Sequence, residues 1–234
     1  MLCRIGVIGA QGRTGQIICS LAQELGTEVV LHGCRDSWKI EGRPEVIIDV
    51  SHRAALSKVL DYCRSEGIPL VEGTSGLLPE DQGSIRKLSE LLPVVQVPNF
   101  TFGHFLQTVL VTHLARSVKR SWDSCECTVL ERHPTYKKDR PSATAKKLAS
   151  LWLEYTNVDV ADIASIRAGL PVSDHEISFT FPGELVSIQH SVADRTAAAR
   201  GAIKAAIWIR EQRPRLWTMS DVYMAEIRDY GISD

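Results

Sequence analysis

The sequence predicts an α/β protein whose first half forms a doubly wound parallel sheet and whose second half forms an α+β domain on an open mixed sheet. Short β-branched runs alternate with helix-like segments up to about residue 104. After that point, a long helix-like segment is followed by several consecutive short strands, a pattern typical of a partly antiparallel sheet. The 234 residues are enough for two small hydrophobic cores.

In the first half, each strand is predicted from a short apolar run bounded by turn residues. The strands are expected at residues 4–8, 28–31, 46–49, 70–72 and 94–97, and the helices between them at 16–25, 53–65 and 79–91. Strands that are joined through helices pair in parallel, with helices on both faces of the sheet. We therefore expect a first domain over residues 1–104.

The second half is predicted to begin with a helix and to be dominated by strands. Helices are expected at 105–117, 143–155 and 195–210, and strands at 126–131, 163–167, 176–181 and 185–191. The last helix is rich in alanine, which allows close packing against a neighbour. We expect a second domain over residues 105–209, with the tail 210–234 returning to the first domain.

The composition excludes several classes of protein. Lysine and arginine number 27 against 28 aspartates and glutamates, with no run of like charge, which argues against a nucleic-acid partner. The first apolar run has about five residues, too short for a signal-peptide core or a membrane span. The six cysteines form no C-x-x-C pair, so neither a zinc knuckle nor a thioredoxin-type redox site is indicated. No cluster of residues has metal-ligand spacing, so no metal is expected. We expect a cytoplasmic protein that does not bind a membrane.

A glycine-rich turn directly follows the first strand. The spacing Gly9-x-x-Gly12-x-x-Gly15 leads into the first helix. Without Cβ atoms the backbone can approach a pyrophosphate, and the helix N-terminus presents amide N–H groups to it. In this strand–turn–helix context the turn predicts a Rossmann-like dinucleotide site. The residues expected to bind the cofactor here are Gly9, Gln11, Gly12, Arg13, Thr14 and Gly15.

The end of the second strand bears on the choice of cofactor. Arg35 could hold a ribose 2′-phosphate through a charge-assisted hydrogen bond, which favours NADPH. Asp36 could instead bond the ribose hydroxyls of NADH if the strand runs longer. A third interpretation is that Arg35 is only a solvated loop cation. NADPH, NADH or both therefore remain open.

Two further strand ends are expected to line the nicotinamide side of the crevice. In an open α/β sheet, ligands lie across the carboxyl ends of the strands. The residues that follow the third and fourth strands are Asp49, Ser51, Gly73, Thr74 and Ser75.

A basic segment before the helix at 143–155 is the best candidate for a substrate site. Ser142 is placed to cap this helix, so the amides of Ala143 and Thr144 can bind a carboxylate. Lys137 adds a fixed positive charge and His133 a titratable proton donor. We therefore expect a small substrate with two carboxylates. A solvent-exposed basic loop with an ordinary helix cap is the alternative.

Motifs in the same order along almost the whole chain resemble the dihydrodipicolinate (4-hydroxy-tetrahydrodipicolinate) reductase family. They are Gly9-x-x-Gly12-Arg13-x-Gly15, Asp49-x-Ser51, Gly73-Thr74-Ser75-Gly76, Pro98-Asn99-Phe100, Glu131-x-His133-x-x-x-Lys137-x-Asp139-x-Pro141-Ser142-x-Thr144-Ala145, Arg167-x-Gly169 and His190-x-x-x-Asp194-Arg195.

The resemblance implies hydride transfer from NAD(P)H to a cyclic imine dicarboxylate in lysine and diaminopimelate biosynthesis. It implies His133 as the proton donor, Lys137 as a catalytic cation, and the turn at Ala143 and Thr144 as a carboxylate site. Pro98, Asn99 and Phe100 would belong to the cofactor site. The second domain would bind the substrate and form a homotetramer through its sheet.

The chain departs from the family pattern at Pro134, where a second histidine is usual, and at Ala143 and Ser173, where glycine is usual. These changes leave two other interpretations open: a related imine or amino-acid oxidoreductase, and a nicotinamide-binding regulator without turnover. Of the remaining histidines, His175 is the best candidate for a further substrate contact.

Overall fold

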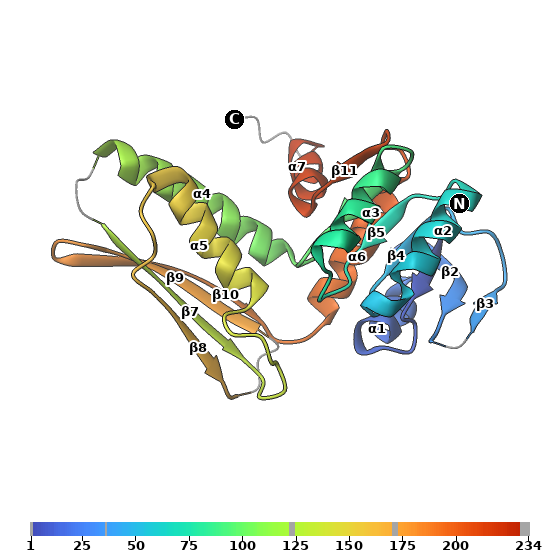
Figure 1. Cartoon of the computed structure of the whole chain (residues 1–234), viewed down its shortest axis with the longest axis horizontal. Coiled ribbons are helices and arrows are strands. Elements are labelled where there is room, and N and C mark those ends of the chain that lie inside the picture. Colours follow the sequence, from blue (N-terminus) through green and yellow to red (C-terminus); the bar gives the residue numbers. More distant parts are fainter. Residues whose placement is uncertain (1, 36, 122–124, 170–172, 230–234) are drawn as a thin grey trace. The chain divides into compact units, whose positions relative to one another are not determined.

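A computed structural model describes the chain except residues 1, 36, 122–124, 170–172 and 230–234 (Figure 1). The chain divides into two compact units. The first unit contains the residues up to Thr101 together with those from Arg195 onward, and the second contains Phe102–Asp194. Each unit has a sheet and helices of its own.

The first unit is built on a seven-stranded sheet with the order β11-β6-β5-β4-β1-β2-β3. All neighbouring strands are parallel except β2 and β3, which are antiparallel. The predicted doubly wound parallel sheet is therefore confirmed. The strands are β1 Cys3–Ile8, β2 Thr27–Gly33, β3 Trp38–Ile40, β4 Val46–Asp49, β5 Leu70–Glu72, β6 Pro93–Gln96 and β11 Arg215–Trp217.

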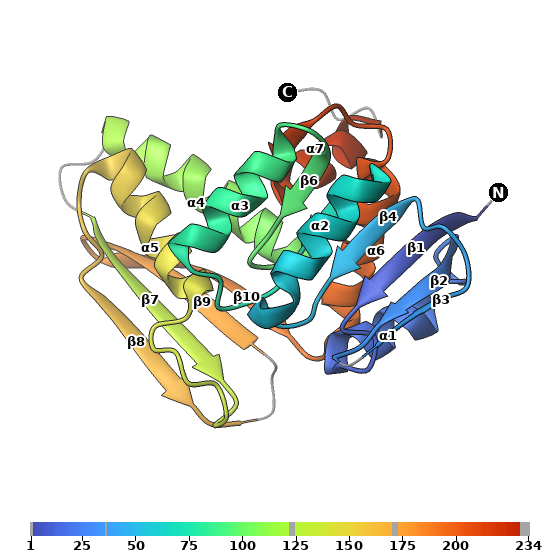
Figure 2. The ribbon, with the colours of Figure 1, turned by 45° about the vertical axis from the view of Figure 1, so that its right-hand side comes forward.

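Helices cover both faces of this sheet (Figure 2). On one face α2 packs against α3, and on the other α6 packs against α1 and against β4, β5 and β6. The helices are α1 Arg13–Leu21, α2 Leu56–Glu66, which follows the 3-10 turn η1 Arg53–Ala55, α3 Pro79–Ser89, α6 Thr196–Ile209 and α7 Met219–Asp229.

The central strands are buried on both faces, which explains why apolar and polar residues do not alternate along them. Val46, Ile47 and Ile48 of β4 are fully inaccessible to solvent. Continuous apolar runs are typical of parallel strands that are covered by helices on both sides. The β4 residue Ile47 belongs to a core cluster with Leu70 of β5 and Val94 of β6.

Helix α6 lies in the first unit, whereas the sequence analysis placed it in the second domain. Its small residues explain the difference, because they allow very close approach to the first sheet. A Cβ atom on Gly201 would lie 1.9 Å from the carbonyl oxygen of Phe100. Ala202, Ala205 and Ala206 of the same helix are fully buried. The alanines indicated close packing but not which sheet the helix would contact.

The sequence analysis did not predict β3, β11 or α7. Strand β11 extends the sheet beside β6, and α7 packs on α6. The buried hydroxyl of Tyr223 in α7 donates a hydrogen bond of 2.6 Å to the carbonyl oxygen of Phe100. The segment after residue 210 is thus tied to the turn that follows β6.

The second unit has a four-stranded open sheet with the order β10-β9-β7-β8. Strands β7 and β8 are parallel, while β9 is antiparallel to β7 and to β10, so the predicted mixed sheet is confirmed. The elements are α4 Phe102–Ser121, β7 Glu126–His133, α5 Ala143–Thr156, β8 Asp162–Arg167, β9 Ser173–Phe181 and β10 Glu184–Val192.

Helices α4 and α5 pack together and cover one face of this sheet (Figure 1). The core between them contains Val111 of α4, Trp152 of α5 and Phe179 of β9. Within the described residues, none of the helices combines the length and apolar character that a membrane crossing requires.

Candidate active site

The glycine turn after β1 has the backbone geometry that phosphate binding requires. Gly9 adopts a φ of +86°, and its amide donates to the carbonyl of Gly33 at 2.8 Å. A Cβ atom on Gly15 would lie 2.1 Å from the carbonyl oxygen of Gly9. Gly12 is the N-cap of α1 and provides no side-chain acceptor. The helix start therefore has no side-chain cap, as in sites where the amides bind a phosphate.

A pocket of about 460 Å³ adjoins this turn. Its lining combines residues of the turn and of α1 with the end of β2 and with β3: Ala10, Gln11, Gln16, Cys19, His32, Cys34, Ser37 and Lys39. Arg35 is exposed next to this lining, and Asp36 lies outside the described residues. Lys39, which the sequence analysis did not select, pairs with Glu41 at 2.8 Å.

The strand-end residues of the first unit hold their turns by hydrogen bonds. Asp49 is fully buried, and its Oδ1 accepts from the amide of Ser51 at 3.0 Å and from the Ser51 hydroxyl at 2.5 Å. Asn99 Oδ1 accepts in the same way from the amide and the hydroxyl of Thr101. These side chains therefore shape the backbone at the carboxyl edge of the sheet.

The next turn in the first unit is tightly packed. Thr74 is buried, and a Cβ atom on Gly73 would lie 2.2 Å from the ring of Phe100. Ser75 is exposed beside them, and Pro98 begins the turn that leads to Phe100. Glycine is required at position 73 because the ring of Phe100 occupies the space of a side chain.

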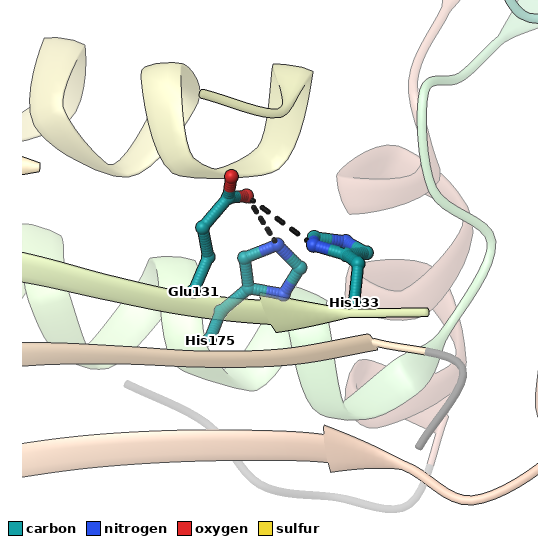
Figure 3. Close-up of side chains that lie close together, drawn as sticks. All are labelled: Glu131, His133 and His175. Carbon is teal, nitrogen blue, oxygen red and sulfur yellow. Dashed lines mark ion pairs between the residues drawn. The ribbon is translucent and has the colours of Figure 1, made fainter. Parts of the chain in front are cut away.

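In the second unit, buried polar side chains converge near the carboxyl end of β7. Glu131 and His133 are two residues apart on β7, so both point to the buried face, and His175 of β9 lies opposite Glu131 in the register (Figure 3). Arg167 ends the neighbouring strand β8. Strand pairing thus brings together groups that are far apart in sequence.

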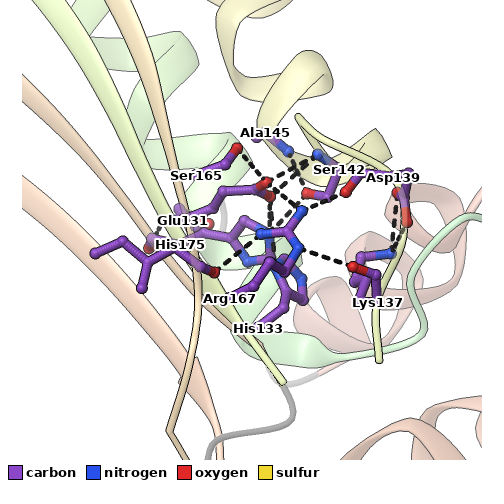
Figure 4. A network of polar contacts seen from close by, with 11 residues as sticks. Glu131, His133, Lys137, Asp139, Ser142, Ala145, Ser165, Arg167 and His175 are labelled. Carbon is purple, nitrogen blue, oxygen red and sulfur yellow. Dashed lines mark hydrogen bonds and ion pairs between the residues drawn. The ribbon is translucent and has the colours of Figure 1, made fainter. Parts of the chain in front are cut away.

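Glu131 is the centre of this network (Figure 4). Its carboxylate accepts from the amide of Ser142 at 3.1 Å, from the hydroxyl of Ser165 at 2.6 Å and from the guanidinium of Arg167 at 2.9 Å. Burial alone would raise the pKa of Glu131. The hydrogen bonds outweigh burial and lower the pKa to about 2, so the carboxylate stays ionised.

The two histidines beside Glu131 are neutral at neutral pH. Their nitrogens lie 3.5 Å (His133 Nδ1) and 3.7 Å (His175 Nε2) from Glu131 Oε2, and their ring centroids are 4.9 Å apart. Burial lowers the pKa of both residues, that of His175 to about 3, because it disfavours the charged form more than Glu131 favours it.

Arg167 also holds the loop that carries the lysine. Its guanidinium donates to the carbonyl of Lys137 at 3.1 Å and to the carbonyl of Asp139. The ammonium of Lys137 lies 2.8 Å from Asp139 and is partly exposed. The fixed backbone of the loop therefore leaves a cation at the surface near the start of α5.

Ser142 connects the loop to the helix. Its hydroxyl accepts from the amide of Ala145, which confirms the predicted N-cap, and lies 3.2 Å from His175 Nε2. Ala143 and Thr144 form the first helical residues beside it. The structure therefore groups Lys137 and Ser142 around the same helix entrance, with His133 connected to them through Glu131 and Arg167.

The network of Glu131, Ser165, Arg167 and His175 is not predicted from the sequence. One signal was available: Glu131 occupies a core-facing position of an alternating strand, and a charge at such a position requires a partner. Glu131, His133 and His175 also present ligand atoms within 4.8 Å of one another, as a metal site would. Arg167 already supplies positive charge to this carboxylate.

Models of the dihydrodipicolinate reductase family match residues 24–100 (its N-terminus) and 106–223 (its C-terminus). A 4-hydroxy-tetrahydrodipicolinate reductase of Thermosipho africanus (strain TCF52B) is 34% identical over 221 residues, which cover 94% of this chain and 97% of the relative. One from Rickettsia peacockii (strain Rustic) is 30% identical, covering 95% and 99%.

A solved structure shares the fold. The dipicolinate-bound dihydrodipicolinate reductase from Paenisporosarcina sp. TG-14 superposes with a TM-score of 0.75 at 19% identity and covers 94% of this chain and 99% of that one. Both halves of the sequence match the same family, and the fold agrees. This chain is therefore a member of the dihydrodipicolinate reductase family.

Proposed function

We propose that this chain is a 4-hydroxy-tetrahydrodipicolinate reductase that uses a nicotinamide dinucleotide in lysine and diaminopimelate biosynthesis. The observation that carries the proposal is the match of both family models and of named relatives over nearly the whole chain. The glycine turn and the loop at 131–145 supply the two kinds of group that the reaction requires, a phosphate cradle and an anion-binding acid–base site.

The first unit fits the cofactor. The close approach of Gly15 to Gly9 leaves no room for a side chain at the turn, and α1 starts without a side-chain cap. The amides at Gly12, Arg13 and Thr14 would hold the pyrophosphate, with Gln11 beside it. The turns at Ser51, Gly73 and Asn99 would line the nicotinamide side. The cofactor supplies the hydride when it is bound.

The second unit supplies the substrate side. The amides of Ala143 and Thr144, at the positive end of α5, would bind one carboxylate, and Lys137 would attract the dianion. His133 would deliver the proton that reduction of a C=N bond requires. A neutral His133 suits the unliganded protein, because the negative charge of a bound substrate then favours the imidazolium.

For the cofactor preference, we infer that NADPH is favoured over NADH through Arg35. Its exposed guanidinium beside the pocket next to the glycine turn supports a contact with the ribose 2′-phosphate. Arg35→Ala is expected to weaken NADPH binding about tenfold and to leave NADH binding unchanged. Equal effects on both cofactors, measured by fluorescence titration, would contradict this role.

We further propose that the enzyme is a cytoplasmic homotetramer assembled through the second-unit sheet. Exposed apolar side chains on its outer strands, Ile166, Leu185 and Val186, support this assembly. The described cysteines are all free, as thiols are in a reducing compartment. Sedimentation analysis is expected to give four chains per particle, and a monomer at assay concentrations would argue against the tetramer.

The activity can be tested with the freshly prepared condensation product of pyruvate and aspartate semialdehyde. We expect oxidation of NADPH or NADH, with Lys137→Ala reduced at least a hundredfold and the neighbouring Lys138→Ala close to wild type. Cofactor binding must persist in the Lys137 variant. A wild-type protein that binds cofactor but does not turn over this substrate would overturn the proposal.

Pro134 and Ala143 favour one second candidate, reduction of a related imino acid, because they remove a histidine contact and narrow the carboxylate site. Preferential turnover of another carboxylated imine in the same assay would identify it. Cofactor binding without turnover of any carboxylated imine would indicate a regulator instead.

A further inference from the structure

Two buried carboxyl groups stand side by side in the first unit. Asp49 is the last residue of β4 and Glu72 the last residue of β5, and the two are directly paired in the parallel register. Both are fully inaccessible to solvent. Adjacent parallel strands lie about 4.8 Å apart, so the two side chains are neighbours at the carboxyl edge of the sheet.

Each carboxyl group uses one oxygen to hold a turn. Asp49 Oδ1 accepts from the amide and hydroxyl of Ser51, and Glu72 Oε1 accepts from the amide of Thr74 at 2.6 Å. The second oxygens, Asp49 Oδ2 and Glu72 Oε2, are buried without a hydrogen-bond partner in the described part of the chain. A buried carboxylate oxygen without a donor is costly.

Within the part of the chain that the structure describes, no positively charged side chain is paired with Asp49 or Glu72. Gln96 of β6 lies beside Glu72 in the sheet, and Ile8 of β1 lies beside Asp49. On one face, the buried residues of α6 are alanine, glycine and isoleucine.

The buried Thr74 hydroxyl is a neutral donor that lowers the pKa of both carboxyl groups. On the other face lie the Cys63 thiol of α2, whose pKa the pair raises, and the Asp81 carboxylate of α3, which raises the pKa of Glu72. Burial raises the pKa of Cys63, so the thiol is neutral. The charge of Arg53 is already paired with Asp81 and Glu80. Among the described titratable groups named here, Cys63 is neutral, Asp81 is acidic, and the positive charge of Arg53 is paired with other carboxylates.

We propose that Asp49 and Glu72 share one proton between Oδ2 and Oε2, forming a carboxylic acid–carboxylate pair that locks together the turns at 50–51 and 73–74. Two like charges in a dry interior cannot both ionise, and a shared proton satisfies both orphaned oxygens with one hydrogen bond. The pKa of Glu72 is consistent with a shared proton. Burial, and then the charge of Asp49, raises this pKa well above its usual range.

The pair makes both turns sensitive to alkaline pH. When the shared proton leaves, two negative charges face each other without solvent, and the turns that they hold are pushed apart. The part of the inference that concerns cofactor affinity rests on the proposed function, which places these turns beside the nicotinamide. Asp49 and Glu72 are positioning residues, because they act through the turns.

Single amide substitutions test the pair, since each mimics the protonated state. In Glu72→Gln, the side-chain oxygen still accepts from Thr74 while the NH₂ group donates to Asp49 Oδ2; Asp49→Asn is the reciprocal variant. The exposed Glu28→Gln on β2 of the same sheet is the control. Stability against urea and the Kd of NADPH and NADH are measured from about pH 6 to about pH 9.5.

We expect the wild type and the control to lose stability as the pH rises from about 6 to the pKa of Glu72, at about 8, and to level off above it, whereas the affinity for cofactor falls above that pKa by up to about tenfold per pH unit. Both amide variants should show flat profiles. An infrared band of a protonated carboxyl group, present in the wild type at neutral pH and absent in Glu72→Gln, gives a readout that needs no cofactor.

Parallel pH profiles for the wild type and both amide variants, or the absence of that infrared band, would overturn the shared proton. If the stability profiles differ as expected but no cofactor binds at any pH, the pair stands and the proposed function fails. If cofactor binds with the same pH dependence in all variants, the positioning role is wrong.

Discussion

The guanidinium of Arg167 lies 2.9 Å from a carboxylate oxygen of Glu131, and the side chains are only 2% and 0% exposed. Removing one partner from such a buried pair leaves an uncompensated charge. We expect Arg167→Met to lower the free energy of unfolding by about 3–5 kcal/mol, measured by urea denaturation. The double variant Glu131→Gln with Arg167→Met should recover part of this loss, because the remaining group is then neutral.

Arg132→Met is the matched control for that prediction. Arg132 is the neighbouring exposed arginine of β7, with its guanidinium 3.8 Å from Asp174. Its loss should cost less than about 1 kcal/mol. If both arginine variants lost the same free energy of unfolding, the buried pair would stabilise the second unit no more than an exposed pair does.

The glycine turn gives a second prediction. A methyl group at position 15 would collide with the carbonyl of Gly9 at 2.1 Å and with the Cα atom of Ala10 at 2.9 Å. We expect Gly15→Ala to weaken dinucleotide binding at least about a hundredfold, because the backbone must shift to relieve the contact. Calorimetric titration with NADPH and NADH measures the effect.

Gly83 of α3 is the control for the turn. A Cβ atom on Gly83 meets nothing within 4 Å, so Gly83→Ala should keep cofactor affinity and stabilise the helix by up to about 1 kcal/mol. Retained affinity in Gly15→Ala would exclude the turn as the phosphate site.

Acid should destabilise the second unit through its buried histidines. Burial lowers the pKa of His104 to about 4, so below about pH 6.5 the unfolded chain binds a proton that the folded chain does not. The stability due to neutral His104 is therefore lost as the pH falls from about 6.5 toward about 4, by at most about 1.4 kcal/mol per pH unit. The difference in unfolding free energy between the wild type and His104→Gln should shrink accordingly.

The exposed His113 on the same helix provides the comparison, and His113→Gln should follow the wild-type profile. The ionisation of Glu131 does not interfere, because its contribution is lost only at lower pH, between about 4.5 and about 2. A His104→Gln profile parallel to that of the wild type would show that His104 takes up a proton in the folded protein.

The hydrogen bond between Tyr223 and Phe100 ties α7 to the turn after β6. In Tyr223→Phe the buried carbonyl loses its donor, at a cost of about 1–2 kcal/mol in unfolding free energy. A neutral Tyr223→Phe would mean that water replaces the hydroxyl at this carbonyl.

The predicted fold was confirmed where sequence patterns are local and strong. The buried apolar run at Val46, Ile47 and Ile48 and the glycines at 9, 12 and 15 each have one structural interpretation in their context. Strands β3 and β11 have three residues each and are exposed or half-buried, so neither shows the buried apolar run that predicted the equally short β5. The alanines of α6 indicated a close contact, but small residues suit either sheet equally well.

In the candidate site, too, the residues that could be predicted belong to local patterns, and those that could not are brought together by the fold. Lys137, Ser142 and Ala143 lie in one continuous segment, where a helix cap and a basic loop can be recognised by spacing. Glu131, Arg167 and His175 meet only because β7 pairs with β8 on one side and with β9 on the other. No local pattern contains that information, since it depends on which strands become neighbours.

The first unit is made of two separate stretches of chain, with the second unit inserted between them. Helix α6, which covers part of one face of the first sheet, is synthesised after the whole second unit. A nascent chain that ends before Arg195 therefore holds a continuous second unit and a first sheet on whose α6 face only α1 is present. The sheet of the first unit is therefore completed only after the whole second unit has been synthesised.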